Sequence, residues 1–203
     1  YTTADWKHYY VRSMRKILKK ADHIVTVSEH SKRDVMKYFG VEESRITNTY
    51  QTTLIPRQTL ERNEADIAIE LDNMFGLGMR NYLLFYGSLE PKKNVGRIVQ
   101  AYLAANIDMP LVLVFAQSWL SKDEGRLINQ VTVDFPTKAG QRIRKLEYLP
   151  FQLLTTLIQG ARAVLFPSLY EGFGLPILVG MTLGTPVITS TTSSMPEVAG
   201  AAA

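Results

Sequence analysis

Apolar and polar side chains recur at near-helical spacing over residues 5–20. The apolar members are Trp6, Tyr10, Met14, Ile17 and Leu18, and the basic ones between them are Lys7, Arg12, Arg15, Lys16, Lys19 and Lys20. This spacing predicts an amphipathic helix with one apolar and one cationic side. Two roles stay open for this helix: contact with an anionic membrane surface, or packing against a domain interface.

A short strand and a capped helix follow. The pattern predicts a strand over residues 23–27 and then a helix that begins at Ser28 or Ser31. Asp34 stands three residues after Ser31, as in a capping box. Gly40 is the residue type that ends a helix in a left-handed conformation, so the predicted helix ends just before it.

Residues 41–80 carry a mixed pattern that a proline and several glycines interrupt. We interpret residues 56–80 as an interdomain linker that contains a short helix around residues 61–74.

From residue 82 onward, short apolar runs alternate with helical patterns. The predicted strands are residues 82–86, 111–115, 143–148, 163–167 and 186–189. The predicted helices are residues 94–105, 121–132, 151–159, 176–183 and a last one from residue 195. Such alternation is typical of α/β proteins with a doubly wound parallel sheet. In these sheets ligands bind beyond the carboxyl ends of the strands, so the segments that follow the strands form the candidate site.

The segment after the predicted strand at 163–167 carries the strongest binding signal. Gly172 and Gly174 allow a tight turn and a close approach of the backbone to a ligand. Pro176 has the backbone angle that the first turn of a helix requires, and the free N–H groups of that turn attract an anion. Glu171, at the edge of the turn, is placed to accept hydrogen bonds from ligand hydroxyls.

Three segments together resemble the retaining glycosyltransferases of family 4. They are residues 86–94 (YGSLEPKKN), residues 168–181 (SLYEGFGLPILVGM), and residues 183–190 with 195–200 (LGTPVITS and MPEVAG). Their order and spacing are similar to those of the nucleotide-binding domain of that family, over residues 81–203. The resemblance implies the GT-B fold, in which two Rossmann-like domains face each other across a cleft.

The resemblance also implies a division of the chain. Residues 1–55 would be a remnant of the acceptor-side N-terminal domain, because residues 21–28 (ADHIVTVS) resemble its last strand. Residues 56–80 would be the linker, and residues 81–203 the nucleotide-sugar-binding C-terminal domain, truncated at its end. We therefore expect a fragment of a longer protein, mainly its donor-binding half.

The functional positions of the family fall on particular residues of this sequence. By resemblance, Lys93 would bind the phosphates of a nucleotide sugar and Glu171 would face the donor sugar, so both are the expected catalytic residues. The expected donor-binding residues are Gly87, Ser88, Lys92, Lys93, Tyr148, Leu149, Glu171, Gly172, Phe173, Gly174, Leu175 and Val179. The three residues from Phe173 to Leu175 would act through their backbone N–H groups.

Some of these positions have structural alternatives. Tyr148 and Leu149 would line the base, or else only pack in the core. Lys92 would supply the charge of the arginine that many family members carry in place of Ser88, or else solvate a helix start against the helix dipole. The residues expected to cap the last helix, rather than to contact a ligand, are Ser193, Ser194 and Glu197.

Val179 departs from the family pattern. The family carries two glutamates with seven residues between them, and the second holds the ribose hydroxyls. Here the first is Glu171, and valine occupies the second position. The chain therefore either binds its donor differently or is a weakened, engineered or degenerate member.

Composition narrows the chemistry further. The chain has 203 residues, no cysteine, three histidines and a formal net charge of +4. The absence of cysteine excludes disulfides and thiolate metal sites, and the histidines are not spaced as a metal set. No Asp-x-Asp pair indicates a metal-bound diphosphate, so we expect metal-independent chemistry without a cofactor. The positive charge suits an anionic ligand or membrane, and no cationic stripe interleaved with aromatic residues indicates nucleic acid.

The main hypothesis is a retaining hexosyltransferase that moves a sugar from a UDP- or GDP-linked donor to a saccharide or lipid-linked acceptor. A mannosyltransferase of polysaccharide biosynthesis is the expected type, in the cytoplasm or peripherally at the inner face of the membrane. The fragment alone would be inactive, because the acceptor wall of the cleft is missing. One alternative is a non-catalytic nucleotide-binding or interaction module, which Val179 supports. Another is a different enzyme of sugar nucleotides or phosphosugars on a similar scaffold.

Overall fold

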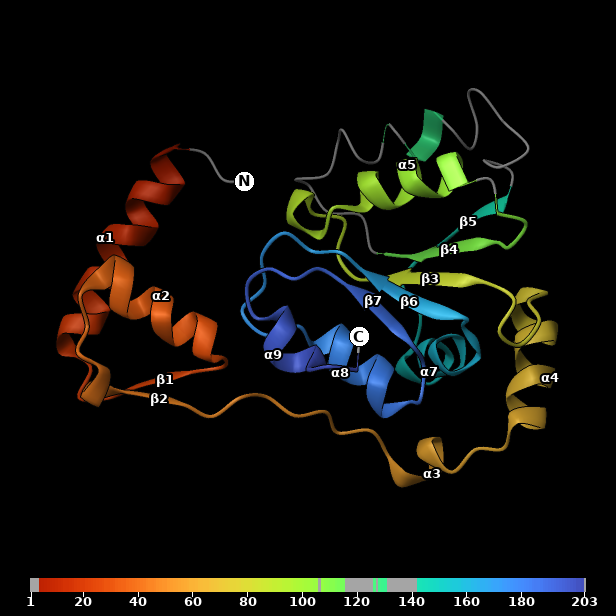
Figure 1. Cartoon of the computed structure of the whole chain (residues 1–203), viewed down its shortest axis with the longest axis horizontal. Coiled ribbons are helices and arrows are strands. Elements are labelled where there is room, and N and C mark those ends of the chain that lie inside the picture. The colour runs from red at the N-terminus through yellow and green to blue at the C-terminus, as the bar shows by residue number, and fades with distance from the viewer. Residues whose placement is uncertain (1–3, 106, 116–125, 127, 131–141, 203) are drawn as a thin grey trace.

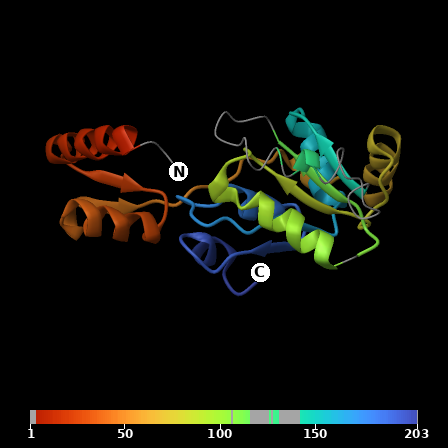
Figure 2. The ribbon, with the colours of Figure 1, turned by 90° about the horizontal axis from the view of Figure 1, so that it is seen from above.

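The computed structural model describes residues 4–105, 107–115, 126, 128–130 and 142–202. They form an N-terminal unit (residues 4–48) and a five-stranded unit (described residues of 57–202), joined by an extended segment (Figure 1). Seen from above, the N-terminal unit lies beyond one end of the larger one (Figure 2). The helix predicted at 121–132 lies mostly outside the described residues.

The N-terminal unit contains α1 (Ala4–Lys20), β1 (Ile24–Thr26), α2 (Glu29–Phe39), η1 (Glu43–Arg45) and β2 (Ile46–Asn48). β1 and β2 pair in parallel, and both helices contribute to a small core around buried Leu18, Ile24 and Ile46. The helix at 5–20 and the strand at 23–27 are thus confirmed. β2 is a strand that the sequence pattern missed, because three residues are too few to show a periodicity.

The start of α2 corrects one expectation. The Ser28 side-chain oxygen accepts a hydrogen bond from the N–H of Ser31 at 2.9 Å, so Ser28 is the cap. Ser31 lies inside the helix, and Asp34 accepts a hydrogen bond from the Tyr170 hydroxyl instead of closing a capping box. Gly40 ends the helix in the left-handed region, with φ at 66°, as predicted.

The five-stranded unit alternates strands and helices. Its elements are α3 (Arg57–Leu60), α4 (Glu64–Phe75), β3 (Leu83–Tyr86), η2 (Pro91–Lys93), α5 (Val95–Ala105), β4 (Leu111–Val114), β5 (Ile143–Leu146), α7 (Phe151–Gly160), β6 (Ala163–Phe166), α8 (Leu175–Thr182), β7 (Val187–Thr189) and α9 (Met195–Ala199). The strand order is β5-β4-β3-β6-β7, and every pairing is parallel. The predicted α/β class with a parallel sheet is confirmed. No helix in the described part of the chain has both the length and the apolar character needed to cross a membrane.

Alternate residues of the central strands enter two separate cores. Leu84 and Val112 lie in the core beneath α4, α7 and α8, whereas Phe85 and Leu113 lie in the core beneath α5. All four are fully buried, and burial of such a side chain contributes about 1.5–3 kcal/mol. Helices on both faces explain why these strands are continuously apolar.

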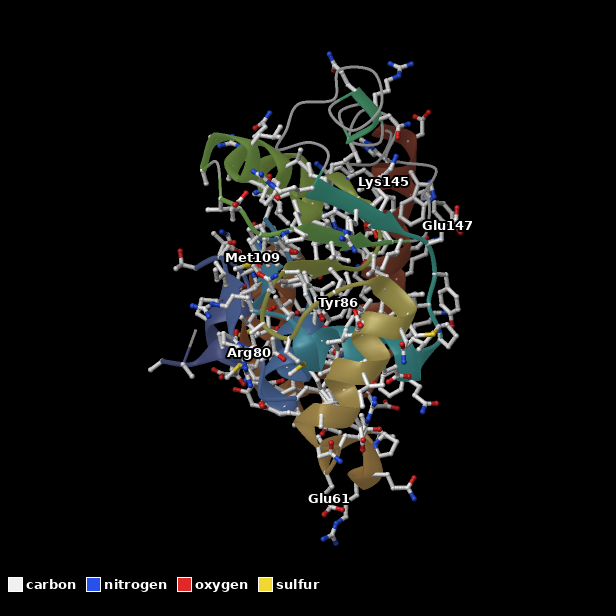
Figure 3. The ribbon with its side chains drawn as sticks, turned by 90° about the vertical axis from the view of Figure 1, so that its right-hand side faces the viewer. Glu61, Arg80, Tyr86, Met109, Lys145 and Glu147 are labelled. Atoms are coloured by element: carbon white, nitrogen blue, oxygen red, sulfur yellow. The ribbon has the colours of Figure 1, made fainter. Side chains whose placement is uncertain are left out.

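The range expected as a linker contributes to the larger core. α4 packs on α7 and buries Ile67 and Leu71 in the cluster beneath the sheet. Figure 3 views this unit from the side of α4, with Lys145 on the edge strand β5 and Glu147 just after it. Residues 57–80 are therefore structurally part of the five-stranded unit.

The strand order creates a switch point between β3 and β6. The chain proceeds from β3 outward to β4 and β5, and then returns to add β6 on the other side of β3. The loops that follow β3 and β6 therefore leave the sheet side by side in diverging directions. Parallel sheets bind their ligands at such a point.

Gly160 allows the close contact between α7 and α4. A Cβ at this position would come within 2.2 Å of the Leu71 Cδ1 atom and 3.0 Å of the Tyr82 hydroxyl. We expect Gly160→Ala to lower the free energy of unfolding by about 1–3 kcal/mol, measured by urea denaturation. The control is Gly78→Ala, where the nearest atom is 3.6 Å away. Equal stability of the two variants would contradict this packing.

Candidate functional site

An ion pair lies at the switch point. The Lys93 ammonium is 2.7 Å from a Glu171 carboxylate oxygen, and each side chain is only 11% exposed. Lys93 ends η2, which follows β3, while Glu171 lies in the loop after β6. The ammonium also stands 4.8 Å from the centre of the Phe166 ring, in a cation–π contact. The two expected catalytic residues thus meet directly.

Backbone contacts hold the two loops together independently of this pair. The N–H of Leu169 donates to the carbonyl of Lys92 at 2.7 Å. The Asn94 side chain donates to the carbonyl of Pro167 at 3.2 Å, and Asn94 itself lies in the left-handed region with φ at 61°. The relative position of the loops therefore does not rest on the ion pair alone.

The two neighbouring lysines have different surroundings. Lys92 points to Glu90, with 3.5 Å between ammonium and carboxylate, and is about one third exposed. The Ser88 hydroxyl also donates to Glu90, and this hydrogen bond, with the nearby lysines, holds the pKa of Glu90 below its ordinary value. Ser88 and Lys92 thus both contact the carboxylate of Glu90, which is partly exposed, while Lys93 pairs with the buried carboxylate of Glu171.

Two residues at the end of β3 bond to neighbouring elements near the ion pair. Gly87 has φ at 146°, in a region that side chains disfavour, and its N–H donates to the carbonyl of Val114. The Tyr86 hydroxyl donates to the carbonyl of Pro176 at 2.9 Å and so holds the start of α8. Burial raises the pKa of Tyr86, which keeps it a neutral donor.

The turn between β6 and α8 presents backbone donors. Gly174 precedes α8 with φ at 116°, and no side chain caps this helix end. Within the described part of the chain, the N–H groups of Phe173, Gly174 and Leu175 donate to no protein acceptor. Because a helix N-terminus also carries partial positive charge, these groups suit an anion.

Two serines that the sequence analysis assigned to helix capping hold this turn instead. The Ser193 hydroxyl donates to the carbonyl of Glu171 at 2.6 Å. The Ser194 hydroxyl donates to the carbonyls of Glu171 and Phe173 at 3.0 and 2.7 Å, and no side chain caps α9. The capping prediction is therefore wrong for both serines. Their position after β7, at the carboxyl edge of the sheet, was the signal that could have revealed them.

The remaining expected donor residues lie apart from the ion pair. Tyr148 is 80% exposed and Leu149 packs against the core, both just after the edge strand β5. Val179 is half-buried in the second turn of α8, against the same core. No hydrogen bond or ion pair among the described residues joins these three to Lys93 or Glu171.

The described residues contain no group of three or more histidine, aspartate or glutamate side chains that could hold a metal ion. The His23 ring bonds to the Thr47 hydroxyl at 2.8 Å, whereas His30 packs edge-on against Tyr170. These two histidines thus have separate structural partners.

Comparison with known proteins agrees with this architecture. The family model "Glycosyl transferases group 1" matches residues 72–203. "O-antigen chain mannosyltransferase B" of Escherichia coli is 34% identical over 98% of this chain and 51% of its own length. "O-antigen chain mannosyltransferase RfbU" of Salmonella typhimurium is 26% identical over 91% of this chain and 46% of its own. The chain thus spans about half the length of these relatives.

Solved structures share the fold. Anabaena HepE in complex with UDP and glucose superimposes with a TM-score of 0.77 at 19% identity, over 92% of this chain and 49% of its own. Sucrose-phosphate synthase from Thermosynechococcus elongatus gives a TM-score of 0.74 at 22% identity, over 93% and 45% of the two chains. At these identities the likeness shows the fold alone, which is the GT-B type.

The ion pair should have a measurable coupling energy. In a double-mutant cycle of Lys93→Met and Glu171→Gln, followed by urea unfolding, we expect a coupling of about 1–3 kcal/mol, because either single change leaves a charge buried without its partner. The exposed pair of Arg57 and Glu61 serves as the control, since solvent screens it. Two cycles with the same small coupling would argue against the buried pair.

Proposed function

The chain belongs to the group 1 glycosyl transferases, and we propose that it is the donor-binding half of a retaining, family 4 type mannosyltransferase. The observation that carries this proposal is the Lys93–Glu171 pair at the switch point of the sheet. A cation and a carboxylate there match two neighbouring parts of a nucleotide sugar: the diphosphate is anionic, and the sugar offers hydroxyl donors.

The pair acts by exchanging partners. In the free chain Lys93 neutralises Glu171. A bound diphosphate takes over the ammonium, and Glu171 then accepts hydrogen bonds from the sugar. The N–H groups of Phe173, Gly174 and Leu175 add donors near the phosphates. Together they stabilise the negative charge that grows on the leaving diphosphate as the glycosidic bond breaks.

Proton transfer in this scheme uses the substrate itself. No protein group at the pair is a convincing general base, because Glu171 is engaged by Lys93 and then by the sugar. As the bond from the anomeric carbon to the diphosphate breaks, the acceptor oxygen bonds to that carbon on the same face and its proton passes to the departing phosphate, which gives retention of configuration. The chemistry needs no metal ion, since Lys93 and the backbone N–H groups balance the phosphate charge.

The substrates follow from the relatives' names. The matched proteins of E. coli and S. typhimurium are named O-antigen chain mannosyltransferases. We therefore assign to this chain a GDP- or UDP-linked sugar, with mannose first, and a saccharide or lipid-linked acceptor in polysaccharide biosynthesis. The non-catalytic alternative is not favoured, because these relatives are named as enzymes. Nucleic acid has no part in the scheme.

α1 supports a location at the inner face of the membrane. Its aromatic and aliphatic side chains Trp6, Tyr10 and Ile17 are 55%, 48% and 57% exposed. Basic residues line the adjoining side of the helix, where Arg12, Arg15, Lys16 and Lys19 border one shallow groove. Exposed aromatic groups beside cations suit the interface of an anionic bilayer, where a lipid-linked acceptor resides.

Transfer by the full-length protein tests the function. We expect the protein to move mannose from a nucleotide donor to a saccharide or lipid-linked acceptor, with the donor anomer retained in the product and activity unchanged by a metal chelator. Product analysis by NMR gives the anomeric configuration. The 203-residue chain alone should be inactive, and turnover by it would show that the active site lies elsewhere.

Lys93→Ala should weaken the binding of a nucleoside diphosphate far more than the binding of the nucleoside. Loss of a charge-assisted contact costs roughly 1.5–3 kcal/mol, which is about one to two decades in Kd. Calorimetric titration with UDP, GDP, ADP and the matching nucleosides measures the difference. Lys92→Ala is the matched control and should lose less, because Lys92 pairs with Glu90 at the rim. Equal losses for diphosphate and nucleoside would mean that Lys93 acts through folding.

Val179→Glu should tighten nucleotide binding through the ribose hydroxyls. A carboxylate one turn into α8 would accept hydrogen bonds worth about 1–3 kcal/mol. An opposing cost arises because Val179 packs against the core, where an unpaired charge is unfavourable. Titration of UDP and GDP with their 2′-deoxy analogues separates these effects, and Thr182→Glu adds the same charge to the exposed end of α8 as a control. A folded variant with unchanged affinity for all four ligands would place Val179 away from the ribose.

A further inference from the structure

The turn that carries Glu171 is held from both units of the molecule. Ser193 and Ser194, at the start of α9, bind its carbonyls from the five-stranded unit. From the N-terminal unit, the Ser31 hydroxyl donates to the carbonyl of Gly172 at 3.1 Å. The conformation of the Glu171 turn therefore depends in part on the position of α2.

Glu197 of α9 is the residue that fixes α2 at this place. Its carboxylate accepts the backbone N–H of Glu29 at 2.7 Å and that of His30 at 2.6 Å. Arg33 adds a longer contact of 3.6 Å, and the Glu197 side chain is only 16% exposed. A carboxylate across the first turn of a helix is held by both hydrogen bonds and the helix dipole. In Figure 1 the two helices accordingly meet where the two units approach each other.

The first turn of α2 depends on this carboxylate to satisfy its donors. The N–H of Ser31 is satisfied by the Ser28 side chain and that of Lys32 by the Ser28 carbonyl, both within the N-terminal unit. The N–H groups of Glu29 and His30 bond across the units to Glu197. Removal of the carboxylate would leave two donors without their partner in a partly buried place.

Backbone strain is found at the same junction. Ser193 has φ at 58°, a conformation that non-glycine residues rarely adopt. The Ser193 hydroxyl donates to the carbonyl of Glu171, and its oxygen accepts a hydrogen bond from the N–H of Glu171 at 3.1 Å. A strained residue that persists beside a ligand-binding turn indicates that the surroundings impose its geometry.

We propose that Glu197 is a positioning residue of the donor site. By binding the first turn of α2, Glu197 holds Ser31 where its hydroxyl donates to the carbonyl of Gly172. This contact sets the orientation that Glu171 needs toward Lys93 and the donor. This inference rests on the proposed function only for the ligand, because the coupling between Glu197 and the turn is a property of the protein itself.

Amide hydrogen exchange by NMR on the 203-residue chain tests the coupling. In Glu197→Gln we expect the amides of Glu29 and His30 to exchange about tenfold faster, since one of the two acceptor oxygens is lost. The amide of Glu171 should follow with an increase of about threefold or more. Glu197→Ala should enlarge both effects. Glu61→Gln, which neutralises an exposed carboxylate paired with Arg57, is the matched control and should change neither.

Nucleotide binding supplies the second measurement. We expect the Kd of GDP or UDP to rise about three- to tenfold in Glu197→Gln, and nucleotide bound to the native chain to slow exchange at Glu29 and His30, because coupling is reciprocal. If Glu197 acted only through folding, the variant would also accelerate hydrogen exchange at core amides such as those of Leu84 and Phe85. That result would contradict the proposal.

The outcomes separate the two claims. If Glu29 and His30 exchange faster while Glu171 does not, Glu197 only caps α2 and the inference is wrong. If the native chain binds no nucleotide, the proposed donor site fails, yet exchange at Glu171 still decides whether Glu197 positions the turn.

Discussion

The parallel pairing of β3 with β6 is the constraint on which the site depends. It places the loops after these strands side by side, so that residues 78 positions apart in the sequence, Lys93 and Glu171, meet at 2.7 Å. The ion pair alone would be a weak reason for this arrangement, because burying two charges costs much of what their attraction returns. The apolar cores on both faces of the sheet, and the backbone bonds between the loops, hold the charges in place.

The sheet and its loops therefore have different roles. The cores supply the stability, and the loops at the carboxyl edge carry residues at unusual backbone angles and, within the described residues, backbone N–H groups without a protein acceptor. Such features are unfavourable in a core and useful at a binding edge. On the proposed function, a diphosphate would have to displace the Glu171 carboxylate from the ammonium of Lys93.

The junction between the two units adds further contacts that hold the Glu171 turn. The turn with Glu171 receives hydrogen bonds from α9 and from α2, and Glu197 ties these helices together. Such contacts link the arrangement of the two units to the geometry of the Glu171 turn. Val179 stands outside this network, and it is the position at which the sequence departs from the resembled pattern of two glutamates.

The pattern of the sequence was sufficient for the parallel α/β unit, because the central strands β3, β4 and β6 are continuous apolar runs that alternate with helical segments. The resemblance of the loops also selected Lys93 and Glu171, which the structure joins in an ion pair. Other features depended on contacts between distant segments. β2 is too short to show a pattern, and α4 looked like a linker until its packing on α7 was seen. Ser193, Ser194 and Glu197 resemble helix caps in the sequence. Only the tertiary structure shows that they bind the Glu171 turn and α2, because a hydroxyl or carboxylate takes the nearest unsatisfied backbone group, and the fold decides which group that is.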